Sequence, residues 1–315
     1  KLHSMYTALH STTNKTEWSQ IGTMIHLLRN AEKDLRIWTS DGVREANDQG
    51  LPMSESELLL RVLRETYTPS LLSLDSVVFE SICQDTFPKL KSEIRQNETF
   101  GKKIAKASMD RHRWPDKNIL QKMMQLDETL AERSFVLLLG DAASGKSECW
   151  KTIARARKLK HENVKVLHPD IHDSTRFIGS LDIMTRDWTD GLFASILREV
   201  STSSLDLLPK DSKDDKNDDE SAKIPSCGSH WIVLDGEPRG NNGWMDSMYS
   251  LLENPCCVEE DKDTTRALHL VSHERLRMEK HVRIIVETTS ISSASPSAIG
   301  RAAIVRVGTN EESED

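Results

Sequence analysis

A run of consecutive residues in the middle of the chain has the types and the spacing that bind phosphate. It matches G-x-x-x-x-G-K-[ST] at every fixed position, and it consists of Gly140, Asp141, Ala142, Ala143, Ser144, Gly145, Lys146 and Ser147. The glycines let successive backbone N–H groups turn toward a phosphate, where a side chain would collide. Lys146 would place its ammonium on the β- and γ-phosphates, and Ser147 would offer its hydroxyl to Mg²⁺. We therefore expect a nucleotide phosphate-binding loop.

The segments on both sides of this loop favour the same interpretation. Residues 135–139 form a short apolar run that ends at Gly140, which is typical of a strand buried on both faces. From Glu148 onward we expect a helix whose positive N-terminal end faces the same anions. An incidental glycine turn would not require a strand before it and a helix after it, so we favour the phosphate-binding loop.

A phosphate-binding loop of this kind needs a carboxylate at the end of a neighbouring strand, and Asp235 follows the apolar residues 231–234. Asp235 could hold the magnesium shell together with Ser147. In hydrolysing AAA+ enzymes a Glu usually follows this Asp and polarises the attacking water, but here that position is Gly236. Glu237 comes one residue later and would face the other way on an extended strand. A local turn could redirect Glu237, so a hydrolysing site that uses it remains an alternative.

The wider hydrophobic pattern indicates an α/β fold. Short apolar runs typical of buried strands recur at residues 164–167, 231–234, 282–286 and 303–307, and helical patterns at 191–200 and 245–252 separate several of them. Buried strands that alternate with helices predict a parallel sheet covered on both sides. A segment of helices at about 17–38, 52–67, 75–85 and before Trp114 precedes this part, and a further helix face spans residues 119–130.

Composition excludes several classes of protein. The 315 residues include 42 basic and 50 acidic ones, a net charge of -8, which argues against nucleic acid as a partner. No apolar run is long enough for an ordinary membrane-spanning helix. The five cysteines form no CxxC pair, which favours free thiols in a reducing compartment, and the 11 histidines show no zinc spacing. Residues 209–225 are charged and almost without apolar side chains, which predicts a disordered acidic insertion. The start at Lys1, without Met, suggests a piece of a longer polypeptide.

Several blocks, taken in order, resemble the motor region of the dynein heavy chain, specifically its second AAA+ module. They are the helical lead-in at residues 51–88, the phosphate-binding loop, His168-Pro169, Leu181-Asp182, the RDWTDGLF block at 186–193, the WIVLDG block at 231–236, residues 272–276 and residues 294–302. The resemblance covers about residues 51–308, and the outer-arm axonemal type is slightly favoured.

This resemblance implies a division of the chain and a set of site residues. Residues 1–50 would end the helical lid of the preceding module, 51–118 would be the helical lead-in, and 119–315 would be the AAA+ P-loop large domain. Residues 140–148, with Glu148 included, and Asp235 would bind ATP or ADP, and Ser147 and Asp235 would be the Mg²⁺ ligands. Arg301 would act as an arginine finger on the nucleotide of the neighbouring module. Glu287, at the end of a strand, could sense the γ-phosphate side or could cap a helix.

The function implied is a nucleotide-binding module of a microtubule motor, with little or no hydrolysis of its own. Its expected partners are the adjacent AAA+ modules of the same heavy chain, the microtubule through the parent motor, and other dynein chains, with no nucleic acid and no membrane. The expected location is cytoplasmic and cytoskeletal, in a ciliary or flagellar axoneme. Two alternatives stay open: a P-loop ATPase that hydrolyses with Glu237, and a ring scaffold whose loop holds no nucleotide.

Overall fold

The computed structural model describes Ala31 and residues 55–71, 73–88, 98–110, 116–171, 173–203, 230–237, 244–252, 266–279, 281–292, 294–299 and 301–308. The acidic insertion expected at 209–225 lies outside these residues. So does the helix expected at 17–38, apart from Ala31, which is helical.

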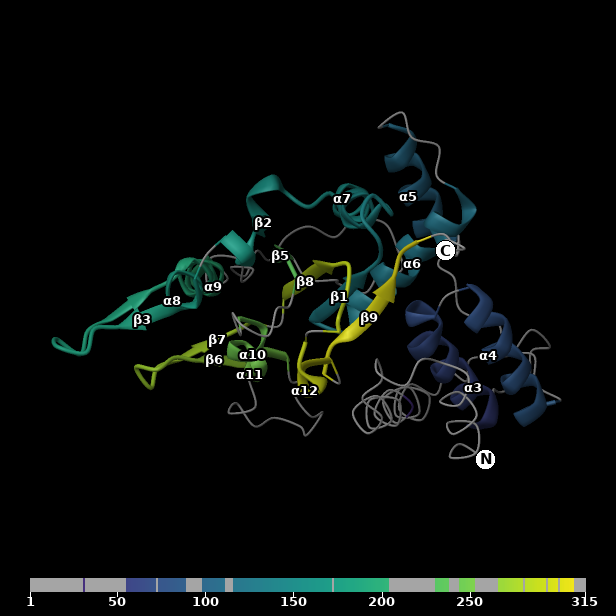
Figure 1. The fold of residues 1–315 in the computed structure, drawn as a ribbon. Coiled ribbons are helices and arrows are strands. Elements are labelled where there is room, and N and C mark those ends of the chain that lie inside the picture. The colour runs from purple at the N-terminus through teal and green to yellow at the C-terminus, as the bar shows by residue number, and fades with distance from the viewer. Residues whose placement is uncertain are drawn as a thin grey trace, which may run out of the picture.

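A five-stranded parallel sheet forms the centre of the molecule (Figure 1). Its strands, in spatial order, are β2 (Val164–Leu167), β5 (His230–Asp235), β8 (Val282–Thr288), β1 (Phe135–Leu139) and β9 (Ala303–Arg306). All the neighbouring pairs run parallel. Every residue of β1 and β8 is buried, as strands covered on both faces require. The α/β fold with a parallel sheet is therefore confirmed.

Alternating residues of the strands face two different hydrophobic clusters. Val136 and Leu138 of β1 pack with the helices α5 (Glu98–Met109), α6 (Lys117–Glu132) and α7 (Lys146–Ala156). Leu137 and Leu139 pack on the other side with α8 (Ser174–Phe177), α9 (Leu192–Ser203), α10 (Trp244–Ser247), α11 (Tyr249–Leu252) and α12 (Pro296–Ile299). The period of two residues in a strand explains why a continuous apolar run serves both layers. The single helix expected at 245–252 is thus divided into α10 and α11, with a turn at Met248 between them.

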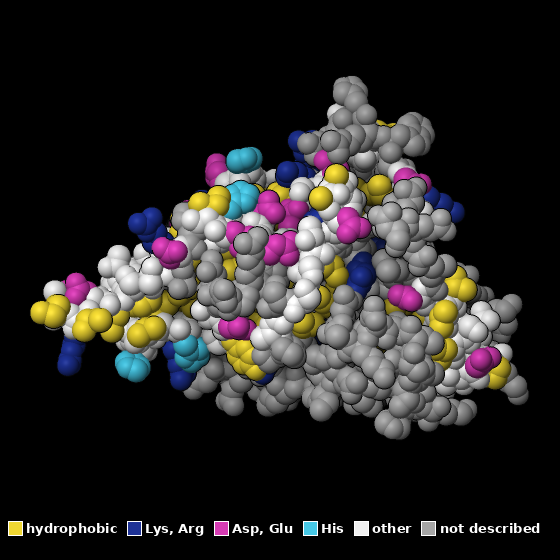
Figure 2. Space-filling view, in the orientation of Figure 1, with side chains coloured by type: hydrophobic (Ala, Val, Ile, Leu, Met, Phe, Trp, Pro, Cys, Tyr) yellow, Lys and Arg dark blue, Asp and Glu magenta, His cyan; other side chains and the backbone are white. Residues whose placement is uncertain are grey.

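Two hairpins extend from the same end of the sheet (Figure 1). They are β3 (Gly179–Leu181) with β4 (Trp188–Asp190), and β6 (Ala267–His269) with β7 (Arg275–Arg277). The tip of the first carries Ile183 and Met184, whose side chains are 89% and 92% exposed. Figure 2 shows hydrophobic side chains at this projecting end of the molecule. Two short 3-10 turns, η2 (His161–Asn163) and η3 (Pro169–Ile171), flank β2.

The N-terminal helices have a hydrophobic cluster of their own. α3 (Glu55–Tyr67), η1 (Thr68–Ser70) and α4 (Ser73–Thr86) bury side chains that include Leu60 and Phe79, at the end of the molecule opposite to the hairpins (Figure 1). Arg64 joins α3 to α4 through hydrogen bonds of 3.0 and 2.7 Å to Glu80. Lys122 of α6 joins this unit to the sheet domain, because its ammonium donates to the carbonyls of Pro69 and Leu71 at 3.2 and 3.3 Å.

Cys83 and Cys149 are free, buried thiols, and burial raises the pKa of each to about 12. Among the helices that the structure describes, none combines the length and the apolar character needed to cross a membrane.

Candidate functional site

The loop between β1 and α7 has the backbone geometry that a phosphate-binding loop needs. Ala143 and Gly145 have positive φ angles of 63° and 94°, so the chain reverses its curvature directly before the helix. Gly145 is the N-cap of α7. A Cβ there would meet nothing within 4 Å, so the left-handed backbone and not a lack of space is what calls for glycine.

Gly140 is required for the opposite reason, which is close packing. A Cβ on Gly140 would lie 1.9 Å from the carbonyl oxygen of Val307 and 2.8 Å from Oγ of Ser144. The chain after β9 runs against the start of the loop, where Val307 N–H donates to the carbonyl of Leu139 at 2.8 Å. The C-terminal strand thus holds the loop in place from one side.

Lys146 and Ser147, whose side chains the motif assigns to phosphate and Mg²⁺, are the first two residues of α7. Lys146 Nζ donates to the backbone carbonyls of Gly140 and Asp141, at 2.5 and 2.8 Å, and so lies across the loop. Ser147 Oγ donates to Oε2 of Glu287 at 2.6 Å. Among the other expected binding residues, Asp141, Ala142 and Ala143 are exposed, and Ser144 is half-buried.

Glu287 is the buried carboxylate of this site. It belongs to β8, its side chain is 5% exposed, and its second oxygen, Oε1, accepts a hydrogen bond from the indole N–H of Trp150. Glu287 therefore binds two side chains of α7, one of them the serine of the motif. The sequence suggested Glu287 only as a sensor of the γ-phosphate side or a helix cap, and its signal was an acidic residue near the end of a largely apolar strand.

Asp235 lies at the end of β5, directly beside Glu287 in the strand register. It is exposed, and its Oδ2 is 3.6 Å from Nδ1 of His168. The structure thus brings two carboxylates together at the carboxyl end of the sheet, one exposed and one buried. Of these, Glu287 is the one that contacts Ser147.

Glu237 turns toward the end of β8. Its carboxylate accepts hydrogen bonds from the hydroxyls of Thr288 and Thr289, both at 2.7 Å, and from the backbone N–H groups of Thr289 and Ser290, at 2.8 and 3.3 Å. Burial acts to raise the pKa of Glu237, but these hydrogen bonds outweigh it and hold the pKa below its ordinary value. We call Glu237, Thr288, Thr289 and Ser290 the β5–β8 clasp.

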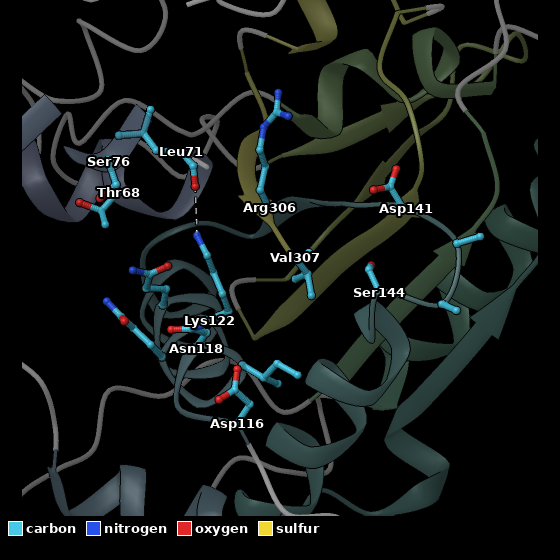
Figure 3. A pocket seen from close by; sticks show the side chains of 16 residues that line it. Thr68, Leu71, Ser76, Asp116, Asn118, Lys122, Asp141, Ser144, Arg306 and Val307 are labelled. Carbon is cyan, nitrogen blue, oxygen red and sulfur yellow. Dashed lines mark hydrogen bonds between the residues drawn. The ribbon is translucent and has the colours of Figure 1, made fainter. Parts of the chain in front are cut away.

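A pocket of about 620 Å³ adjoins loop residues 141–144 (Figure 3). The loop, α6, the N-terminal helices and the chain after β9 all contribute to it. Its walls include Thr68, Leu71, Ser76, Asp116, Asn118, Lys122, Gln125, Asp141, Ser144, Arg306 and Val307. This volume lies within the range of small-molecule and cofactor sites.

Two pocket residues on α6 went unnoticed in the sequence. Burial lowers the pKa of Lys122 to about 8. Gln125 is 8% exposed, and its Oε1 is buried without a hydrogen-bond partner among the described residues. Both are polar residues on a helix whose buried side chains are mainly apolar, and that contrast was the signal available in the sequence.

Glu148 and Arg301 lie apart from this arrangement. Oε1 of Glu148 accepts a hydrogen bond from the hydroxyl of Thr152, one turn along α7, at 3.2 Å. The guanidinium of Arg301 stacks on the ring of Tyr249, with 3.9 Å between its central carbon and the ring centroid. The carbonyl of Arg301 accepts a hydrogen bond from Arg133 at 3.4 Å. These contacts leave the expected roles of both residues as predictions.

The donors near the loop fit a magnesium ion that is bound together with a nucleotide. Ser147, Asp235 and Glu287 supply hard oxygen atoms, which Mg²⁺ prefers. Within the described ranges no group of three or more His, Cys, Asp or Glu side chains could hold a metal by itself. Mg²⁺ usually takes one or two protein ligands and fills the remaining positions with phosphate oxygens and water.

Comparison with known proteins shows a similarity to dynein heavy chains. Residues 37–147 match a family described as "Hydrolytic ATP binding site of dynein motor region", a match that includes the whole loop and ends before Asp235. The chain is 27% identical over 259 residues to the ciliary dynein beta chain of Tripneustes gratilla, and 28% identical over 262 residues to the cytoplasmic dynein heavy chain of Dictyostelium discoideum. It is 26% identical over 273 residues to the alpha chain of the flagellar outer arm dynein of Chlamydomonas reinhardtii.

Each of these alignments covers 82% of this chain and 5% of the relative. The alignments with these relatives therefore cover much more of this chain than residues 37–147, which match the family. The phosphate-binding loop, the parallel sheet behind it and the alignments with axonemal and cytoplasmic heavy chains lead to one conclusion: the chain is similar to the motor region of dynein heavy chains over most of its length, and its α/β fold is consistent with an AAA+ domain.

Proposed function

We propose that this module binds ATP or ADP with Mg²⁺ as a structural or regulatory ligand and hydrolyses it little or not at all. The observation that carries the proposal is the loop at residues 140–147, which joins a buried strand to a helix and adjoins a pocket of about 620 Å³. The phosphates would lie on the loop, near Lys146 and Ser147, and the nucleoside would extend into the pocket. Asp235 would complete the magnesium site.

The β5–β8 clasp supports the low-turnover part of the proposal. Gly236 occupies the position after Asp235 and has no side chain that could polarise water. Glu237 is ionised at neutral pH, since its pKa is lowered, but its oxygens already accept hydrogen bonds from Thr288, Thr289 and Ser290. To act as a base, Glu237 would have to give up these contacts. We therefore favour nucleotide binding over hydrolysis through Glu237.

At the level of the parent protein, we propose that the module is the second in a ring of AAA+ modules in a microtubule motor. Arg301 would reach the nucleotide of the preceding module, which carries out the main hydrolysis. The relatives named above include ciliary, flagellar and cytoplasmic dyneins, and the ciliary and flagellar ones support an axonemal location. Other dynein chains and the microtubule would then be partners of the parent motor.

The first test is direct identification of bound nucleotide. Purified protein is denatured, and the released nucleotide is separated by chromatography and compared with protein concentration. We expect near-stoichiometric ADP or ATP from the wild-type chain and almost none from Lys146→Ala. The absence of nucleotide from the wild type, together with no binding in calorimetry, would favour the scaffold alternative.

A second test measures turnover. With the other P-loops of the complete motor disabled, steady ATP hydrolysis that Glu237→Gln abolishes would favour the hydrolysing alternative.

A further inference from the structure

We propose that Glu287 is a positioning residue for the divalent cation at this loop, and that it makes nucleotide binding depend steeply on Mg²⁺. This inference rests on the proposed function and assigns a role to a residue outside the phosphate-binding motif. Its basis is the contact between the buried carboxylate of Glu287 and the hydroxyl of Ser147, 2.6 Å apart.

The carboxylate of Glu287 has one orientation because its two oxygens have different donors. Trp150 Nε1–H can only donate, so Oε1 of Glu287 must be its acceptor. Oε2 then faces Ser147, whose hydroxyl donates its proton to the carboxylate, as the 2.6 Å distance indicates for a bond of the O–H···O⁻ type. The proton of Ser147 is thereby directed toward β8. Both lone pairs of Ser147 Oγ remain available to a cation.

The strand order explains why Glu287 and not Asp235 has this position. β8 lies between β5 and β1, and the loop follows β1. Asp235 and Glu287 are register partners, so Glu287 lies one strand closer to the loop. Asp235 is exposed and lies near His168, whereas Glu287 is 5% exposed and contacts the loop serine.

Two neighbouring carboxylates near the phosphates have an electrostatic consequence. Without a cation, their negative charges oppose a nucleotide's phosphates, and the buried charge of Glu287 is poorly screened. A divalent cation between the phosphates and these oxygens would reverse that balance. The site should therefore bind nucleotide weakly without Mg²⁺ and much more tightly with it.

The decisive variant is Glu287→Gln, which keeps the shape of the side chain. Its single carbonyl oxygen is needed by Trp150, so the amide N–H group would face Ser147 and donate to its hydroxyl. The Ser147 proton would then point away from β8, toward the cation. Glu287→Asp is a second variant, because it keeps the charge but shortens the reach to Ser147.

The measurement is the affinity of the full chain for ADP by calorimetry, once with Mg²⁺ and once with EDTA. The Mg²⁺ ratio is the dissociation constant in EDTA divided by that in Mg²⁺. We expect this ratio to be smaller in Glu287→Gln than in the wild type by about tenfold or more, since outer-shell partners of metal ligands commonly contribute 10- to 100-fold to metal affinity. Affinity in EDTA should be unchanged or higher, because a negative charge is removed. Glu287→Asp should reduce the ratio through weaker binding with Mg²⁺. The double variant Glu287→Gln/Ser147→Ala should reduce the Mg²⁺ ratio little more than Ser147→Ala alone, because the two residues act through one contact.

The control is Asp127→Asn. Asp127 is also a buried carboxylate that anchors α7, through hydrogen bonds of 2.5 and 2.6 Å with Arg157 directly after the helix, but it does not contact the loop serine. We expect Asp127→Asn to lower the melting temperature and to leave the Mg²⁺ ratio unchanged.

If Glu287 had a purely structural role, Glu287→Gln would behave like Asp127→Asn, with a lower melting temperature and an unchanged Mg²⁺ ratio. That result would overturn this inference and leave the proposed function intact. A wild-type chain that binds no ADP in either condition would overturn the proposed function and this inference together.

Discussion

Thr289 donates both its backbone N–H and its hydroxyl to one oxygen of Glu237, at 2.8 and 2.7 Å. Glu237 follows β5 and Thr289 follows β8, so these bonds tie together the ends of two adjacent strands where the phosphates are proposed to lie. The carboxylate that sequence considerations offered as a catalytic base is thus a structural part of the β5–β8 clasp. Its turn toward β8 was the redirection that the extended-strand argument could not foresee.

This arrangement predicts that Glu237→Gln lowers stability without reducing hydrolysis at this module. The amide loses acceptor capacity toward Thr288, Thr289 and Ser290, and hydrogen bonds to charged groups contribute about 1.5–3 kcal/mol. Denaturant unfolding should show a loss of this order at pH 7. Because the pKa of Glu237 is lowered in the folded chain, the stabilisation is present above the unfolded pKa and is lost as pH falls through the folded pKa. Glu199→Gln is the control, since Glu199 is in an exposed ion pair with Lys165.

Gly140→Ala should be strongly destabilising because the new Cβ would meet the carbonyl oxygen of Val307 at 1.9 Å. Val307 cannot easily move, since its N–H bonds to Leu139. We expect a loss of about 3 kcal/mol or more in the free energy of unfolding, at the upper end for overpacking. Gly308→Ala is the matched control, because nothing lies within 4 Å of its Cβ position. Equal stability of the two variants would show that β9 does not constrain the loop.

Gln125→Leu should weaken nucleotide binding while leaving the free chain equally or more stable. Gln125 lines the pocket, and its buried Oε1 has no hydrogen-bond partner among the described residues. Such an acceptor costs about 1–3 kcal/mol. A donor on the bound nucleoside would satisfy it. Calorimetry with ADP should show weaker affinity by about tenfold, and thermal unfolding should show no loss. The control is Gln121→Leu, because Gln121 is exposed and lines the same pocket. It should change neither the affinity for ADP nor the thermal stability. Weaker binding in both variants would point to a general effect of apolar substitution.

Arg301→Ala, in the complete motor, should slow hydrolysis at the preceding module and leave nucleotide occupancy at Lys146 intact. A guanidinium can bridge two phosphate oxygens, and an arginine finger contributes about 10³–10⁵ in rate. Arg301→Lys should restore turnover only in part. Because Arg301 stacks on Tyr249, Tyr249→Leu separates loss of the stack from loss of the charge. Steady-state ATPase and nucleotide content are measured on the same samples. Normal turnover in Arg301→Ala would contradict the role of an arginine finger.

Glu128 predicts a pH dependence of stability. Burial raises its pKa to about 8, and the carboxylates of Glu65, Asp127 and Glu132 act in the same direction. The pKa of Glu128 in the folded chain is thus above its unfolded value. The contribution of protonated Glu128 to stability is therefore fully present below the unfolded pKa and is lost as pH rises through about 8. Melting temperatures at pH 5, 7 and 9 should therefore fall less steeply for Glu128→Gln than for the wild type. Identical slopes would contradict the raised pKa, and Glu162→Gln, at an exposed position, should follow the wild type.

The amino-acid sequence by itself determined the features that depend on neighbouring residues. The motif at 140–147 lies between a run of apolar residues and a helical pattern, and each of these is local, so strand, loop and helix could be predicted together. The continuous apolar run at 135–139 and the largely apolar run at 282–286 likewise indicated strands buried on both faces, because a covered parallel sheet accommodates such runs. The dynein resemblance was carried by blocks of the same local kind.

Only the tertiary structure decided which distant side chains meet at the loop. Ser147 and Glu287 are 140 positions apart in the chain, and Trp150 and Glu287 are 137 apart. Their contact follows from the placement of β8 between β5 and β1, and strand order is not encoded in the pattern of any single strand. The turn after Asp235 was equally inaccessible, since the direction of Glu237 is set by donors at the end of β8. Local hydrophobic period determines the elements, and long-range packing determines which polar groups they bring together.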